Sequence, residues 1–245
     1  MVTWIELRES IRTGRANKAI LPIGSFEQHG PHLPLSTDTV LAEYLADQVA
    51  GRCQGTFLLP CIQLGCSSEH LGFAGTISLT PGTMRGLIID ITRSLTQTGL
   101  KNLFIINGHG GNTATINSTL AEVKQILPDM HVYAFSILDI VKQKFDEIRK
   151  SERGLVGHAD EIETSMMLAV TPDLVNMSKA VREAPSFAKP LTFEPDHIAT
   201  ISFAWNAGEL TESGVIGDPT LATVETGKAL LDFATQVISN VINEL

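Results

Sequence analysis

Two segments of the chain gather carboxylate and imidazole side chains with no cysteine among them. The first, residues 24–39 (GSFEQHGPHLPLSTDT), follows an apolar run and contains Glu27, His29, His32 and Asp38. The second, residues 107–113 (NGHGGNT), holds His109 between glycines, which let the backbone turn sharply beside whatever the ring binds. Carboxylates and imidazoles together suit Zn²⁺, Mn²⁺ or Fe²⁺. We therefore expect a divalent-metal site whose ligands include Glu27, His29, Asp38 and His109.

The segment 157–168 (GHADEIETSMML) adds one more candidate ligand. If a helix begins at Asp160, Glu163 lies on the same face as the apolar residues Met166 and Met167. A carboxylate on an apolar face is unusual unless it is paired or bound to a metal. Glu163 is therefore the fifth predicted metal ligand.

The same segment offers two proton donors. His158, just before the predicted helix, is the first choice, with a capping or packing role as the alternative. Glu161 is the second choice, although its position in the helix predicts a solvated acid of the first turn. The sequence contains no H-E-x-x-H, G-x-S-x-G or Gly-Lys-Ser/Thr motif, which disfavours a helix-borne zincin site, a serine hydrolase and a P-loop.

Other side chains are expected around this site rather than in it. Glu69 and His70 lie in the Gly- and Ser-rich segment 61–79 and are predicted to line the mouth. Trp205 is predicted to cover a planar substrate, with core packing as the alternative. His32 is expected to orient the site, or to face solvent from a turn stiffened by its neighbouring prolines.

The elements that must position these residues alternate between short apolar runs and longer helical patterns. The predicted strands are 19–23, 56–59, 103–106 and 131–135. The predicted helices are 37–50, 81–98, 113–126, 138–150, 160–170 and 221–245, and the segments 61–79 and 171–219 are irregular. Wholly apolar strands that alternate with helices favour a mostly parallel sheet, hence a three-layer α/β/α sandwich. We expect a single α/β domain over residues 1–245, with its site at the carboxyl ends of the strands.

Composition narrows the functional class. The 245 residues carry 18 Lys and Arg against 27 Asp and Glu, a net charge of −9, which disfavours nucleic-acid binding. There is no apolar run long enough for a membrane span and no signal-peptide pattern, so we expect a cytoplasmic protein without a membrane partner. The three cysteines (Cys53, Cys61 and Cys66) are predicted to be reduced, small apolar residues.

Several motifs resemble those of the creatininase (creatinine amidohydrolase) family. They are LPIGSFEQHGPHLPLSTDT, SSEHLGFAGTISL at 67–79, NGHGGN, the ETS of 163–165, and GVIGDP at 214–219. The first motif is highly specific, and all of them occur in the family's order. The resemblance implies a three-layer α/β/α fold, a paired divalent-metal site, hydrolysis of a non-peptide C–N bond, and a homo-oligomer, commonly a hexamer.

The resemblance also implies how the ligands divide between two metals. Glu27 and His109 would bind one ion, His29 the other, and Asp38 would bridge them. In the creatininase pattern, the position two residues after the equivalent of His109 is an acid, and this acid binds the second metal. Here that position is Gly111, and Glu163 is the predicted replacement.

These inferences predict a metal-dependent amidohydrolase that cleaves a cyclic amide or a formamide. Its cofactors would be two divalent ions per chain (Zn, Mn or Fe), which activate water for attack on a small-molecule amide. The family is functionally divided, with a formamide hydrolase of flavin and deazaflavin biosynthesis and a peptide-processing member of the mycofactocin pathway. Two alternatives therefore stay open: a single-metal (Fe or Zn) formamide hydrolase, and a non-catalytic metal-binding protein.

Overall fold

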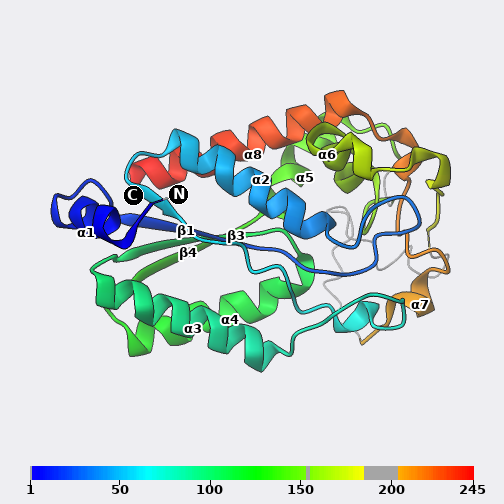
Figure 1. The fold of residues 1–245 in the computed structure, drawn as a ribbon. Helices are drawn as coiled ribbons and strands as arrows, with labels where there is room; N and C mark the ends of the chain where they lie inside the picture. Colours follow the sequence, from blue (N-terminus) through cyan, green and yellow to red (C-terminus); the bar gives the residue numbers. More distant parts are fainter. Residues whose placement is uncertain (1, 153–154, 185–203) are drawn as a thin grey trace.

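The centre of the molecule is a four-stranded parallel sheet with the order β2-β1-β3-β4 (Figure 1). The computed structural model describes residues 2–152, 155–184 and 204–245. The strands are β1 (Lys18–Ile23), β2 (Thr56–Leu58), β3 (Asn102–Asn107) and β4 (His131–Ser136). All four agree with the predicted runs to within one residue at each end, and the parallel sheet is confirmed.

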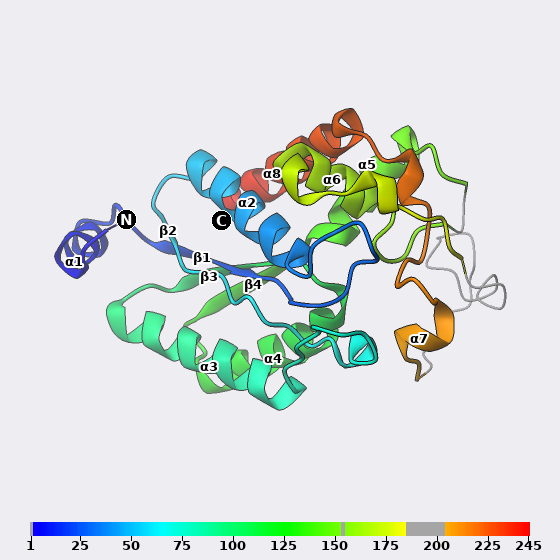
Figure 2. The same ribbon diagram turned by 45° about the vertical axis from the view of Figure 1, so that its right-hand side comes forward.

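Helices cover both faces of this sheet (Figures 1 and 2). On one face lie α2 (Thr37–Arg52), α5 (Ile137–Ile148), α6 (Glu161–Val170) and α8 (Val224–Glu244). On the other lie α3 (Pro81–Thr98) and α4 (Thr113–Ile126). The three-layer α/β/α sandwich predicted from the alternating pattern is therefore confirmed.

The core is divided by the sheet because successive strand residues point to opposite faces. Ile20 of β1 and Phe104 of β3 pack towards α2 and α8. Leu21 of β1 and Ile105 of β3 pack towards α3 and α4. Both faces are buried, which explains why these strands are apolar runs rather than alternating ones.

Local signals account for the bounds of α3, which match the predicted helix 81–98. The side chain of Thr80 accepts a hydrogen bond from the backbone N–H of Thr83, and Pro81 occupies the first turn of α3. Gly99 ends the helix in the left-handed conformation, with φ of 95°.

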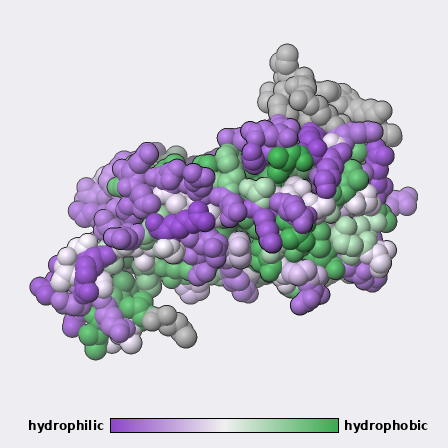
Figure 3. All heavy atoms as spheres, turned by 90° about the horizontal axis from the view of Figure 1, so that it is seen from above, coloured by the Kyte–Doolittle hydropathy of each residue, from purple (hydrophilic) through white to green (hydrophobic). Residues whose placement is uncertain are grey.

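Two helices were not predicted. Helix α1 (Trp4–Arg12) begins with a capping box between Thr3 and Glu6 and projects from the body of the molecule with no buried residue (Figures 1 and 3). Its apolar residues Trp4, Leu7 and Ile11 fall at helical spacing, and Leu7 and Ile11 are half-buried. Helix α7 (Ala207–Leu210) is a single turn within the predicted irregular segment 171–219. Residues 185–203 of that segment lie outside the described residues.

No helix in the described parts of the chain combines the length and the apolar character that crossing a bilayer requires. Cys53, Cys61 and Cys66 are free, as predicted.

Candidate metal centre

The site begins where β1 and β3 end beside each other. Ile23 is paired with Asn107 in the sheet, so the loops that follow both strands leave from the same edge. A Cβ atom on Gly108 would lie 2.5 Å from the carbonyl oxygen of Asp38, so only glycine allows this approach. The close packing of the β3 loop on α2 brings His109 to Asp38.

Asp38 lies at the centre of the site. Its Oδ1 is 3.1 Å from Nε2 of His29, and its Oδ2 is 3.0 Å from Nδ1 of His109. The Ser25 hydroxyl donates a hydrogen bond of 2.8 Å to Oδ2. Burial opposes ionisation, yet the His29 and His109 rings hold the pKa of Asp38 well below its usual range. Although Asp38 belongs to the first turn of α2, its side chain serves these two rings rather than capping the helix.

Each of these two rings turns its other nitrogen to a backbone carbonyl. Nδ1 of His29 is 3.2 Å from the carbonyl oxygen of Glu27, and Nε2 of His109 is 3.0 Å from that of Cys66. Metal-binding histidines usually donate their second N–H to a carbonyl or carboxylate in this way. Although burial opposes it, Asp38 and the other carboxylates raise the pKa of His29 to about 10, and Glu27 and Asp38 raise that of His109 to about 9.

Glu27 is fully buried. Its exposed fraction is 0%, and neither carboxylate oxygen accepts a hydrogen bond from a residue that the structure describes. Oε2 lies 3.2 Å from Nε2 of His109, and burial raises the pKa of Glu27 to about 6. A buried carboxylate without donors is costly unless a cation compensates it, so Glu27 fits a metal ligand.

Glu163 reaches the same cluster from the first turn of α6. Its Oε2 lies 3.8 Å from Nε2 of His29 and accepts a hydrogen bond of 2.6 Å from the backbone N–H of Ala159. Burial raises its pKa to about 8. Glu163 therefore lies on the buried face of α6 together with Met166 and Met167, as predicted, and its carboxylate faces His29 in the loop after β1.

The ligand atoms form three overlapping groups that could each hold a metal ion. The groups are Glu27, Asp38 and His109; His29, Asp38 and Glu163; and Glu27, His29 and His158. In the first two groups, Asp38 is the shared member, as a bridging ligand would be. The oxygen and imidazole donors fit Zn²⁺, Mn²⁺ or Fe²⁺.

His158, the first-choice proton donor, lies within this cluster. Its Nε2 donates a hydrogen bond of 2.7 Å to the carbonyl oxygen of Gln28, so Nδ1 carries the free lone pair in the neutral ring. Nδ1 is 3.9 Å from Oε1 of Glu27. Burial, together with the His29 and His70 rings, holds the pKa of His158 well below its usual value.

Glu161 does not join the cluster, and its predicted exposure is wrong. The side chain is fully buried and accepts hydrogen bonds from the backbone N–H groups of Lys150 (3.1 Å) and Ser151 (2.7 Å). The chain after α5 therefore covers this side of α6, a tertiary contact that helix periodicity does not reveal. The structure directs the Glu161 side chain to the α5–α6 connection, and Glu161 belongs to none of the three ligand groups.

A family model for creatininase, described as creatinine amidohydrolase, matches residues 1–242. The chain belongs to the creatininase family. Creatinine amidohydrolase of Pseudomonas putida is 30% identical over 257 residues, which cover 99% of this chain and 95% of that protein. Mycofactocin precursor peptide peptidase of Mycobacterium ulcerans (strain Agy99) is 33% identical over 221 residues, which cover 86% of this chain and 78% of that protein.

Solved creatininase structures share the fold. A manganese creatininase superposes with a TM-score of 0.83 at 29% identity, covering 99% of this chain and 96% of the other. A creatininase variant of Zn–Zn type gives a TM-score of 0.81 at 29% identity, covering 99% and 95%. The chain is thus a creatininase-family hydrolase, and metal binding accords with the clusters described above.

The residues predicted to surround this creatininase-family site take different positions. His70 is buried, with Nε2 at 3.6 Å from Oε1 of Glu27, and burial lowers its pKa to about 3. Trp205 is half-buried, and its ring meets that of His70 edge-on at 6.3 Å. Oε1 of Glu69 lies 3.9 Å from Nε2 of His109. All three therefore lie within or beside the cluster.

His32 is buried rather than solvent-facing. Its Nε2 lies 2.9 Å from the hydroxyl oxygen of Thr164, next to Glu163 in α6, and burial lowers the pKa of His32 to about 4. The ring thus ties the β1 loop to the helix that carries Glu163.

Gln28 is a residue that the sequence analysis missed. Its side-chain Nε2 lies 2.9 Å from Nδ1 of His70 and donates to the carbonyl oxygen of Gly214, while its own carbonyl oxygen holds His158. Its position between Glu27 and His29 was the available signal. An extended chain points Gln28 away from both neighbours, and that side proves to be packed against His70 and the GVIGDP segment.

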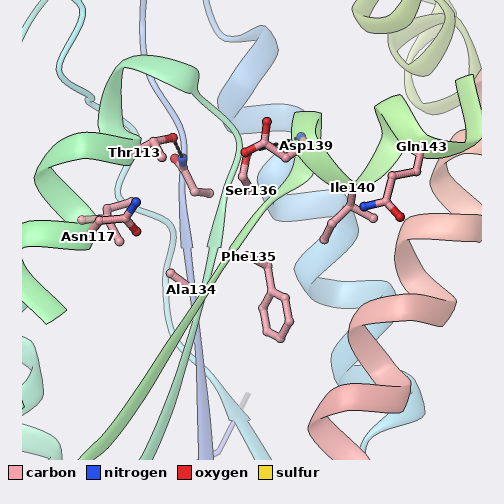
Figure 4. A pocket seen from close by; sticks show the side chains of 10 residues that line it. Thr113, Asn117, Ala134, Phe135, Ser136, Asp139, Ile140 and Gln143 are labelled. Carbon is pink, nitrogen blue, oxygen red and sulfur yellow. Dashed lines mark hydrogen bonds between the residues drawn. The ribbon is translucent and has the colours of Figure 1, made fainter. Parts of the chain in front are cut away.

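A separate pocket of about 270 Å³ lies at the carboxyl ends of β3 and β4, between α4 and α5 (Figure 4). Its lining includes Thr113, Asn117, Phe135, Ser136, Asp139 and Gln143. Asn107 also lines it, and the Asn107 amide holds the backbone N–H and the carbonyl of His109. Among the described residues, none of the three metal-binding groups includes a pocket residue, so the pocket adjoins the scaffold of the site and not its ligands.

Proposed function

We propose that this chain is a metal-dependent amidohydrolase that cleaves a non-peptide C–N bond in a small-molecule amide, with two divalent ions per chain. The observation that carries the proposal is the position of Asp38. Its two oxygens face two different histidines, and it is common to two groups of candidate ligands. Zinc and manganese are the first metals to test, because relatives are known as manganese and zinc forms.

In this proposal the ligands divide around Asp38. Glu27 and His109 hold one ion, and His29 and Glu163 hold the other. Glu163 thereby takes the place of the acid that the creatininase pattern has at the position of Gly111. The support for Glu163 is its buried carboxylate, which lies 3.8 Å from His29 and accepts, among the described residues, a single hydrogen bond, from the backbone N–H of Ala159.

When bound, such ions polarise the substrate carbonyl and make a water molecule acidic enough to attack it. The protein's own part is proton transfer and orientation. His158 is held by the Gln28 carbonyl so that Nδ1 faces the cluster, where it can take up a proton and return it to the departing nitrogen. Glu161, bound to backbone N–H groups, takes no part.

The substrate is proposed to be a cyclic amide or a formamide. His70 and Trp205 border the cluster on the side where α7 lies against the turn Ser68–His70 (Figure 2). A peptide is the competing substrate class, because one relative is a precursor peptide peptidase.

The test starts from metal-free protein that is reloaded with Zn²⁺ or Mn²⁺. Hydrolysis is then measured on creatinine, on an N-formyl amide and on a short peptide, with His158→Gln and the exposed Glu225→Gln as matched variants. We expect turnover of a non-peptide amide only after reloading, unchanged in Glu225→Gln and strongly reduced in His158→Gln. Turnover of the peptide alone would contradict the substrate class. One ion per chain at full activity would favour the single-metal hydrolase, and bound metal without turnover would favour a non-catalytic protein.

A further inference from the structure

The space that a side chain on Gly111 would occupy is filled by atoms of Cys66, His109 and Glu69. A Cβ atom on this residue would lie 2.3 Å from the carbonyl oxygen of Cys66, 2.5 Å from Nε2 of His109 and 2.8 Å from Oε1 of Glu69. No side chain fits there without moving the backbone of Cys66. The creatininase pattern has an acid at this position, and here a carboxylate from another loop occupies the same space.

Glu69 reaches this space from the turn Ser68–His70. Its Oε1 is 3.9 Å from Nε2 of His109, the nitrogen that faces away from Asp38. Its side chain is only 20% exposed. Among the described residues, no lysine or arginine forms an ion pair with Glu69, and the basic group that it faces is the His109 ring.

The loop that carries Glu69 is anchored to the same scaffold. The backbone N–H of Cys66 donates a hydrogen bond of 2.8 Å to Oδ1 of Asn112, whose Nδ2 donates to the carbonyl oxygen of Gly24. The backbone N–H of Ser67 donates to the hydroxyl of Ser78 at 2.8 Å. The bonds through Asn112 hold the start of this loop against the segments that follow β1 and β3. The loop that carries Glu69 is therefore fixed to the same segments that carry the predicted ligands.

We propose that Glu69 is a positioning residue of the metal centre, which acts on His109 from the space above Gly111. The inference rests on the proposed paired-metal function. The ligands Glu27, Asp38 and Glu163 bring three negative charges against the four positive charges of two divalent ions, and Glu69 supplies the fourth. At 3.9 Å Glu69 makes no hydrogen bond to His109, whose Nε2 faces the Cys66 carbonyl at 3.0 Å, so it acts on the ring through its negative charge.

A role in substrate binding alone is the competing explanation for Glu69. In that case, neutralising its charge would raise KM and leave the affinity for the metal unchanged. A role in positioning His109 predicts the opposite, because the metal then loses an outer partner whether or not a substrate is bound.

The experiment compares Glu69→Gln, Glu69→Asp and the exposed control Glu225→Gln with the wild type. Zn²⁺ affinity is measured by competition with a chelator, the Co²⁺-loaded proteins are compared by visible absorption, and metal-free stability is measured by thermal unfolding. We expect Glu69→Gln to bind Zn²⁺ about 10–100-fold more weakly and to shift the Co²⁺ spectrum, at unchanged metal-free stability. Glu69→Asp should recover part of the affinity, and Glu225→Gln should match the wild type.

Unchanged Zn²⁺ affinity and Co²⁺ spectrum in Glu69→Gln would overturn the proposal, and a higher KM alone would assign Glu69 to the substrate. A wild type that binds no metal would overturn this proposal and the proposed function together. A wild type that shows the expected loss in Glu69→Gln but hydrolyses no amide would support the role of Glu69 while contradicting the proposed function.

Discussion

The first turn of α6 presents two buried glutamates to two different regions of the molecule. Glu161 faces the α5–α6 connection, where two backbone N–H groups neutralise much of its cost of burial. Glu163 faces the strand-end cluster, where it receives one backbone N–H and lies among the acidic side chains of Asp38 and Asp160. One residue lies between them in the chain, and both are buried, with exposed fractions of 0% for Glu161 and 3% for Glu163.

This comparison shows that burial does not by itself identify a metal ligand. What differs is whether the protein supplies hydrogen-bond donors to the carboxylate. Glu161 accepts two backbone hydrogen bonds and has a structural role. Among the described residues Glu27 accepts no hydrogen bond and Glu163 accepts one, so a cation would compensate the burial of these two carboxylates. Four predictions test this division.

The largest effect is expected at the residue shared by both groups of ligands. Asp38→Asn should lose both ions and reduce kcat/KM by more than about 100-fold, since the loss of an outer partner alone costs 10–100-fold in metal affinity or activity. Metal content by plasma mass spectrometry and steady-state kinetics measure the two effects, with circular dichroism to confirm folding. Two ions retained in a folded Asp38→Asn protein would contradict the bridging position.

A smaller effect is expected at Glu163. Glu163→Gln should lose one ion of two. Its metal-free stability should stay the same or rise, because the amide oxygen still accepts the hydrogen bond from Ala159 and position 163 no longer carries a buried charge. Metal content and urea unfolding of the metal-free protein check this. If both ions stay bound, Glu163 is not a ligand.

The matched change at Glu161 should give the reverse result. Glu161→Gln should keep both ions and lower the free energy of unfolding by about 1–3 kcal/mol, because a buried charged acceptor of two backbone N–H groups is weakened. The same two measurements apply. Loss of metal without loss of stability would place Glu161 in the site after all.

The smallest effect concerns pH. Burial raises the pKa of Glu163 to about 8 and that of Glu27 to about 6, so in metal-free protein both carry protons over part of the neutral range. A metal binds the ionised carboxylates and the neutral rings of His29 and His109, whose pKa values are raised to about 10 and about 9, so binding releases protons from all of these groups. The affinity should therefore rise with pH from about 6 upwards, by about tenfold per unit for each proton released. Calorimetry in buffers of different ionisation enthalpy measures this release. Affinity independent of pH over this range would contradict the assignment.

The sequence predicted most of the fold because its signals are local. Apolar strand runs and the Thr80-Pro81 start of α3 depend on neighbouring residues, and the observed elements follow them. Helix α1 was missed although Trp4, Leu7 and Ile11 are spaced as on one helix face and Thr3 and Glu6 form a capping box, so this signal was available in the sequence. The ligands predicted from the segments 24–39 and 107–113 do lie together, because the carboxyl ends of β1 and β3 meet at one edge of the sheet. They are Glu27, His29, Asp38 and His109.

What the sequence could not show depends on chain segments that meet only after folding. Helix periodicity separated Glu163 from Glu161 correctly, but it could not reveal that the chain after α5 covers Glu161. Likewise, Gly111 looks like a missing acid in the sequence, and only the path of the Cys66–Glu69 loop explains why no side chain fits there. Such contacts depend on tertiary packing rather than on spacing along the chain.

The central claim is that Asp38 lies between two metal ions, and anomalous scattering from a crystal loaded with Zn²⁺ tests it most directly. Data collected on both sides of the zinc absorption edge should show two peaks, one among Glu27, Asp38 and His109 and one among His29, Asp38 and Glu163, with Glu161 remote from both. A single peak, or two peaks that do not share Asp38, would contradict the account.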